Sequence, residues 1–225
     1  MSEKSLRFAR IKNINTSLRV CWLLNGVFMK RDWKVLLIGG SSATGKSYLA
    51  RQLAAYYHIP LTEVDDIRIA VQQIADKQKH PDLFYFLEQQ NYLQINESDQ
   101  LVRRLINVAN EIWPALNELI TKHIVCDEPV IFEGDGIVPK LLAERDLNSV
   151  RYLFLIDSKE NIKLKDIARN RGNEYTEEDI DLQAEFSARF GAELEKQATY
   201  YQFPVIKSQP LETLYTRALH ILEEV

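Results

Sequence analysis

Residues 39–50 of this 225-residue chain read GGSSATGKSYLA, a glycine-rich loop between two segments of regular pattern. The apolar run at 35–38, VLLI, is typical of a buried strand. After the loop, Leu49, Leu53 and Tyr57 recur every four residues, as they do on one face of a helix. The loop is therefore expected to join the end of a strand to the N-terminus of a helix, where unpaired backbone N–H groups gather.

Within this loop, residues 40–47 match the phosphate-binding pattern G-x-x-x-x-G-K-[ST] in full. Glycines let the backbone bend around an anion, and the successive N–H groups and the helix dipole attract phosphate oxygens. Lys46 is expected to reach the β- and γ-phosphates of a nucleoside triphosphate, and Ser47 to ligate Mg²⁺. The residues expected to contact the nucleotide in this segment are Gly40, Ser41, Ser42, Ala43, Thr44, Gly45, Lys46, Ser47 and Tyr48.

Further along the chain, short apolar runs alternate with amphipathic helical segments. The runs expected to form strands lie at 61–64, 130–132, 152–156 and 204–206. This alternation predicts an α/β fold of the P-loop NTPase class, a Rossmann-like three-layer αβα sandwich with a central parallel five-stranded sheet. Ligands bind such sheets beyond the carboxyl ends of the strands. The acidic residues expected at those ends are Asp65, Asp66, Glu133 and Asp157.

The composition indicates which binding partners and which cellular compartment are expected for this chain. The formal net charge is -4 and the pI is about 5.7, which argues against a dedicated nucleic-acid binder. Cys21 and Cys126 lie far apart and form no metal-binding or disulfide pattern, which favours the reducing cytoplasm. No apolar run is long enough to span a bilayer, so we expect no membrane partner. The oligomeric state is left open.

Several classes of protein carry a phosphate loop of this kind. The chain lacks the N-K-x-D motif with which GTPases recognise guanine. Its strand ends carry single acidic residues, whereas AAA-type ATPases carry a pair of acidic residues at the end of one strand. It resembles the P-loop small-molecule kinases, a group that includes nucleoside monophosphate kinases, zeta toxins and 2-phosphoglycerate kinase. The segments that carry the resemblance are GGSSATGKS at 39–47, VDDIR at 64–68, IFEGDGIVP at 131–139 and ARNRG at 168–172.

The resemblance implies a domain organisation and two cofactors, ATP and Mg²⁺. Residues 33–225 would form the kinase domain, with a helical acceptor-side region at 80–125 and a lid at 168–180 that closes over ATP. Residues 1–32 would be a non-catalytic extension. This extension could be an upstream segment from a mistaken start codon, a flexible arm, or an added helix that packs on the body.

The resemblance also implies roles for individual side chains. Asp65 would meet the acceptor hydroxyl and take its proton, forming the catalytic set with Lys46 and Arg171. Arg171 and Arg169 would hold the transferring phosphoryl group by hydrogen bonds from their guanidinium groups to its oxygens. The acceptor would be contacted by Asp65, Arg68 and Glu133, and the metal would be held by Ser47 and Glu63.

Structural alternatives stand beside these roles. Asp65 or Asp66 could serve as a helix cap, since aspartate is favoured there. Arg169 and Arg171 could neutralise the C-terminal dipole of the preceding helix, and Arg68 could be a solvated surface residue.

The function expected on these grounds is that of an ATP-dependent small-molecule kinase, similar to 2-phosphoglycerate kinase, acting on the hydroxyl or phosphate of a metabolite. Between 80 and 125 the candidates for binding a phosphorylated nucleotide are Arg103 and Arg104, too few to assign a nucleotide acceptor. The alternatives are a nucleotide-binding regulatory ATPase without an acceptor and a zeta-toxin-like kinase of sugar nucleotides.

Overall fold

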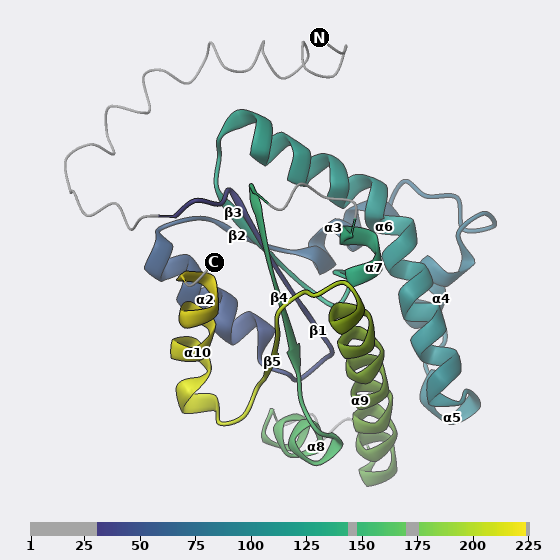
Figure 1. The fold of residues 1–225 in the computed structure, drawn as a ribbon. Coiled ribbons are helices and arrows are strands. Elements are labelled where there is room, and N and C mark those ends of the chain that lie inside the picture. The colour runs from purple at the N-terminus through teal and green to yellow at the C-terminus, as the bar shows by residue number, and fades with distance from the viewer. Residues whose placement is uncertain (1–30, 144–147, 170–175, 224–225) are drawn as a thin grey trace.

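The computed structural model describes residues 31–143, 148–169 and 176–223. Within them, five strands form one sheet in the order β2-β3-β1-β4-β5, and each neighbouring pair is parallel (Figure 1). The strands are β1 (Val35–Gly40), β2 (Leu61–Glu63), β3 (Val130–Glu133), β4 (Val150–Ile156) and β5 (Val205–Lys207). β1, which leads into the phosphate loop, is therefore the central strand, and the predicted sheet is confirmed.

Helices connect the strands and cover the sheet. They are α2 (Lys46–Tyr57), α3 (Val64–Gln72), α4 (Pro81–Glu88), α5 (Tyr92–Ile95), α6 (Ser98–Cys126), α7 (Pro139–Leu142), α8 (Lys159–Ala168), α9 (Glu177–Tyr200) and α10 (Leu211–Glu223). The spacing of Thr176 and Asp179 predicts the start of a helix, and this is confirmed, because Thr176 caps α9 and forms a reciprocal capping box with Asp179.

Side chains of β1 alternate between two buried layers. Leu36 and Ile38 pack with α2 and α10, whereas Val35 and Leu37 pack with α3, α6 and α9. Figure 1 shows these two sets of helices on opposite sides of the sheet. Both faces of the central strand are thus removed from water, at a gain of roughly 1.5–3 kcal/mol per fully buried aliphatic side chain. The result is the three-layer sandwich that the sequence predicts.

The end of β2 differs from the prediction in a way that matters for the site. The strand ends at Glu63, and Val64 is already the first residue of α3. Asp65 therefore lies in the first turn of a helix and does not share a strand face with Glu63. The cause is packing: Val64 is buried beneath Gly134, so closely that a Cβ at that glycine would be 2.8 Å from Val64 Cβ. The carboxylates of Asp65 and Asp66, in the first turn of α3, also stabilise the helix by interacting with the positive N-terminal end of its dipole.

Two smaller expectations also change. The sequence predicts helical structure across 82–95, and the structure divides this stretch into α4 and α5. From its spacing, Ile74 is expected on the buried face of a helix after β2, but it lies beyond the end of α3 and is 88% exposed. Leu119, expected on the apolar stripe of α6, is 37% exposed, and its neighbour Ile120 is the buried residue. Periodicity alone fixes the buried face of a helix only to within one residue.

Candidate functional site

The phosphate loop has a backbone that its glycines make possible. Gly40, Ala43 and Gly45 all have positive φ, at 148°, 59° and 94°. A Cβ on Gly40 would lie 2.4 Å from the carbonyl oxygen of Leu155, which is immovable backbone of β4. Gly45 is the N-cap of α2 and has no side chain to occupy the helix N-terminus. The first-turn N–H groups of α2 are therefore available to an anion.

Hydrogen bonds hold this loop in a defined shape. The Thr44 hydroxyl donates to the carbonyl oxygen of Ser41 at 2.8 Å, and Lys46 Nζ donates to the same oxygen at 2.9 Å. From the segment after β5, the buried Ser208 hydroxyl donates to the carbonyl oxygens of Thr44 and Ile156. The loop is thus fastened to two neighbouring strands before any ligand binds, which lowers the ordering cost of nucleotide binding.

A cavity of about 170 Å³, here called the loop cavity, opens beside the phosphate loop. It is bounded by that loop, the carboxyl ends of β2 and β3, the first turn of α3 and the residue after α8. The predicted site residues that line it are Ser42, Ala43, Gly45, Lys46, Ser47, Glu63, Asp65, Glu133 and Arg169. The structure therefore brings together side chains that lie more than 120 positions apart in the sequence.

Two carboxyl groups in the loop cavity are electrostatically perturbed. Burial raises the pKa of Glu133, which is 4% exposed, and a hydrogen bond with Ser47 and the charge of Lys46 oppose that rise. Burial and the nearby Asp135 raise the pKa of Asp65, against the opposing charges of Arg68 and Lys46. A carboxylate with a raised pKa is better suited to accept a proton near neutral pH.

Arg68 is close to the expected base. Its Nη2 atom lies 3.2 Å from Asp65 Oδ1, three residues earlier on α3. The pair restricts the movement of the Asp65 carboxylate, which lines the loop cavity together with Lys46 and Ser47.

The donors in the loop cavity suit a magnesium ion. Mg²⁺ prefers oxygen ligands, keeps several waters, and is usually held by one or two carboxylates together with substrate phosphates. Ser47, Glu63 and Glu133 offer a hydroxyl and two carboxylates beside the phosphate loop. In the part of the chain that the structure describes, no group of three or more His, Cys, Asp or Glu is arranged to bind a metal by itself. The set fits a metal shared with a nucleotide.

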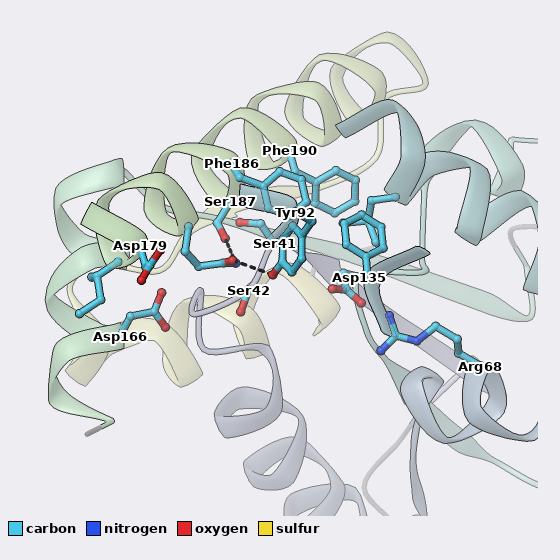
Figure 2. Close-up of a pocket in the computed structure, with 14 residues that line it drawn as sticks. Ser41, Ser42, Arg68, Tyr92, Asp135, Asp166, Asp179, Phe186, Ser187 and Phe190 are labelled. Carbon is cyan, nitrogen blue, oxygen red and sulfur yellow. Dashed lines mark hydrogen bonds between the residues drawn. The ribbon is translucent and has the colours of Figure 1, made fainter. Parts of the chain in front are cut away.

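A second cavity, of about 230 Å³, lies between the phosphate loop and helix α9 and is here called the α9 cavity (Figure 2). It shares Ser42 and Asp135 with the loop cavity, so the two adjoin. Asp135 was not among the site residues predicted from the sequence. The polar residues that α9 contributes, Gln183 and Ser187, also escaped prediction, although their spacing of four puts two polar groups on the face that carries Phe186 and Phe190.

Other predicted residues lie elsewhere. Tyr48 is 48% exposed on α2 and lines neither cavity. Arg171 lies outside the described residues. Asp157, at the end of β4, holds α8 in place: it accepts hydrogen bonds from Asn161 Nδ2 at 2.7 Å and Lys165 Nζ at 2.5 Å.

Within the described residues, the structure contains no helix both long and apolar enough to cross a membrane. No protein-family model matches the chain. Among curated proteins, the chain is 25% identical over 211 residues to a 2-phosphoglycerate kinase of Methanococcus maripaludis, covering 87% of this chain and 66% of that protein. It is 26% identical over 159 residues to a 2-phosphoglycerate kinase of Methanocaldococcus jannaschii, covering 67% and 50%. The chain thus spans about half to two thirds of the length of these relatives.

Among solved structures, a gluconokinase from Sinorhizobium meliloti superimposes with a TM-score of 0.54 and 16% identity. The superposition covers 87% of this chain and 94% of the gluconokinase. Likeness at this level of identity concerns the fold. Together with the parallel sheet, it confirms the predicted P-loop NTPase fold, and with the curated relatives it confirms the resemblance to P-loop small-molecule kinases.

Proposed function

We propose that this protein is an ATP-dependent kinase that transfers the γ-phosphoryl group to a hydroxyl of a small metabolite. The observation that carries the proposal is the composition of the loop cavity, where Lys46 and Ser47 of the phosphate loop face the carboxyl groups of Asp65 and Glu133. Phosphoryl transfer requires little beyond positioning and cancellation of charge, and these side chains supply both.

Each side chain has a distinct part in the reaction. The loop N–H groups and Lys46 hold the triphosphate. Asp65 accepts the proton of the acceptor hydroxyl as that oxygen bonds to the γ-phosphorus and the bond to the ADP oxygen breaks. Arg169, exposed at the C-terminal end of α8, balances the charge on the moving phosphoryl group, and we assign the same part to Arg171. The products are ADP and a phosphate monoester.

Magnesium fits this arrangement as the second cofactor. We assign its binding to Ser47 and Glu63, with Glu133 orienting its water ligands, because these oxygens lie beside the phosphate loop. When bound, the ion would neutralise charge on the β- and γ-phosphates.

The relatives named 2-phosphoglycerate kinase make 2-phosphoglycerate the first acceptor to assay. The assay measures ADP release with Mg·ATP alone and with each member of a panel of metabolites. Release that depends on an acceptor supports the kinase. A slow rate indifferent to every acceptor would support a regulatory ATPase, and a rate that rises only with sugar nucleotides would support a zeta-toxin-like kinase.

Two substitutions test the assigned chemistry. Asp65→Asn keeps the shape of the side chain but removes the base, so kcat should fall by about 10²–10⁴-fold while nucleotide affinity is kept. Lys46→Ala should weaken both nucleotide binding and turnover. Asp66→Asn is the matched control, because Asp66 is exposed in the same helical turn and lines neither cavity. Full activity in Asp65→Asn would contradict the proposed role of that carboxylate.

A further inference from the structure

One wall of the α9 cavity is aromatic. The rings of Phe86 on α4 and Phe186 on α9 stack with centroids 6.2 Å apart and planes inclined by 15°. Tyr92 packs edge-on against Phe86 at 5.2 Å. Phe190 extends this wall along α9 and is 1% exposed. Such a wall binds the flat or apolar face of a ring better than it binds an open, charged chain.

Uncharged polar groups line the same cavity. The Tyr92 hydroxyl donates to Gln183 Oε1 at 3.1 Å, and Gln183 Nε2 donates to the Ser187 hydroxyl at 3.3 Å (Figure 2). Amides and hydroxyls of this kind both donate and accept hydrogen bonds. They match the hydroxyl groups of a ligand without requiring that the ligand be charged.

The charged groups of the α9 cavity are unfavourable for an anion. Carboxyl groups of Asp135, Asp166 and Asp179 line it, against one guanidinium, that of Arg68, among the described residues. Hydrogen bonds from Thr176 lower the pKa of Asp179 and keep its carboxylate charged. Figure 2 shows Asp166 and Asp179 near one end of the cavity and Arg68 and Asp135 near the other, so acids are present at both ends.

The two arginines of α6 do not change this balance, because neither Arg103 nor Arg104 lines the cavity. Arg104 Nη1 lies 2.5 Å from Asp82 Oδ1, and its guanidinium stacks 3.9 Å from the centre of the Tyr85 ring. It is absent from the lining of the cavity. Arg68 itself is paired with Asp65. Among the described residues, the side chains that line the α9 cavity therefore present more negative than positive charge to a ligand that carries its own phosphate or carboxylate.

We infer that the acceptor is a non-anionic cyclic alcohol, bound in the α9 cavity with its ring against the aromatic wall and one hydroxyl directed toward Asp65. This inference rests on the proposed kinase function. The volume of about 230 Å³ lies below the roughly 300–1,000 Å³ of pockets for drug-sized ligands, which favours a single substituted ring over a larger ligand. The reaction forms a phosphate monoester at that hydroxyl, and the proton of the hydroxyl passes through Asp65 to solvent.

The test compares matched acceptors with the full chain and Mg·ATP. Hexoses, cyclitols and amino sugars are assayed beside the same rings bearing a phosphate or a carboxylate, and beside 2-phosphoglycerate. We expect kcat/KM to be at least about tenfold higher for the non-anionic rings, because the anionic ones pay a charge penalty in the cavity. Binding of a fluorescent ATP analogue is measured on the same preparation.

Variants locate the acceptor. Gln183→Leu should raise the KM of the preferred ring alcohol about tenfold and leave the KM of ATP unchanged, because it removes the amide at the middle of the hydrogen-bonded chain. Ser187→Ala, a smaller change, should act in the same direction. Glu195→Gln is the control, since Glu195 is exposed on the same helix outside the cavity.

The outcomes separate this inference from the function on which it rests. If the protein binds the ATP analogue and only phosphorylated or carboxylated acceptors stimulate ADP release, the kinase stands and the acceptor class is wrong. Unchanged KM values in both α9 variants would also overturn the acceptor site. If no nucleotide binds, or no acceptor of any charge stimulates ADP release, the proposed function fails and the inference fails with it.

Discussion

Glu133 has a proposed part in the metal site, but its burial lowers the stability of the folded chain when its carboxyl group is ionised. Its carboxyl group is buried at the end of β3, where burial raises its pKa above the ordinary value of 4.5. The folded protein therefore keeps a proton on Glu133 at pH values where the unfolded chain has released it. Stability consequently declines as the pH rises from 4.5 through the raised pKa, because ionised Glu133 is better solvated when the chain unfolds.

Glu133→Gln should remove this penalty. We expect the variant to gain stability relative to the wild type as the pH rises across that window, with a constant difference above it, because glutamine carries no proton to lose. Activity should fall by about 10–100-fold, as when a group that orients a metal site is lost. Urea denaturation between pH 4 and pH 8 measures the first effect, and ADP release the second. A variant less stable than the wild type at pH 8 would contradict the argument.

The sequence predicts some residues of the site far better than others. Lys46 and Ser47 follow from a local pattern, because the loop that positions them is built from consecutive residues. The sequence does not predict that Asp65 lies within the first turn of α3, because this depends on the packing of Val64 beneath Gly134, some 70 positions away. Gln183 joins the site only through the tertiary placement of α9, which no local pattern encodes.

At the scale of elements, the phosphate loop depends on the close approach of β4. Gly40 combines a φ of 148° with a hypothetical Cβ contact of 2.4 Å to a backbone oxygen of β4. Gly40→Ala should therefore cost about 1–3 kcal/mol of stability from strain at this site and should weaken nucleotide binding. Thermal unfolding and titration with a fluorescent ATP analogue measure the two effects.

Gly191, within α9, is the matched control for that substitution. A Cβ there would lie 3.4 Å from Ser41 Oγ, an ordinary contact distance. Gly191→Ala should accordingly be neutral, or stabilising by up to about 1 kcal/mol because alanine favours the helix. Equal losses of stability and nucleotide affinity in the two variants would contradict the argument that the backbone strain and close contact at Gly40 cause its effect.

The order of the elements was largely predictable from the sequence, whereas their junctions were not. The five strands and the capping box of α9 follow from local apolar runs and a cap pattern. The break between α4 and α5 and the early end of β2 arise where tertiary packing competes with periodicity. Both junctions border the α9 cavity or the loop cavity, which is why the acceptor side was predicted less fully than the nucleotide side.

For the whole molecule, the phosphate loop joins the two layers of the core. β1 contributes side chains to both buried clusters, and the loop that follows it is bonded to Ser208 beyond β5. A nucleotide that binds this loop stabilises only the folded chain, so its binding energy should appear as global stability. Separate stabilisation of one layer is not expected.

Mg·ATP should therefore raise the melting temperature of the whole chain. At a nucleotide concentration of one hundred times Kd, the gain is about 2.7 kcal/mol. For a chain of this size each kcal/mol corresponds to about 2–4 °C, which gives a shift of about 5–11 °C. EDTA should reduce the shift by removing the metal that Ser47 and Glu63 are proposed to hold, and Lys46→Ala should abolish most of it. Calorimetry showing an identical shift with and without EDTA would mean that this loop binds the nucleotide without magnesium.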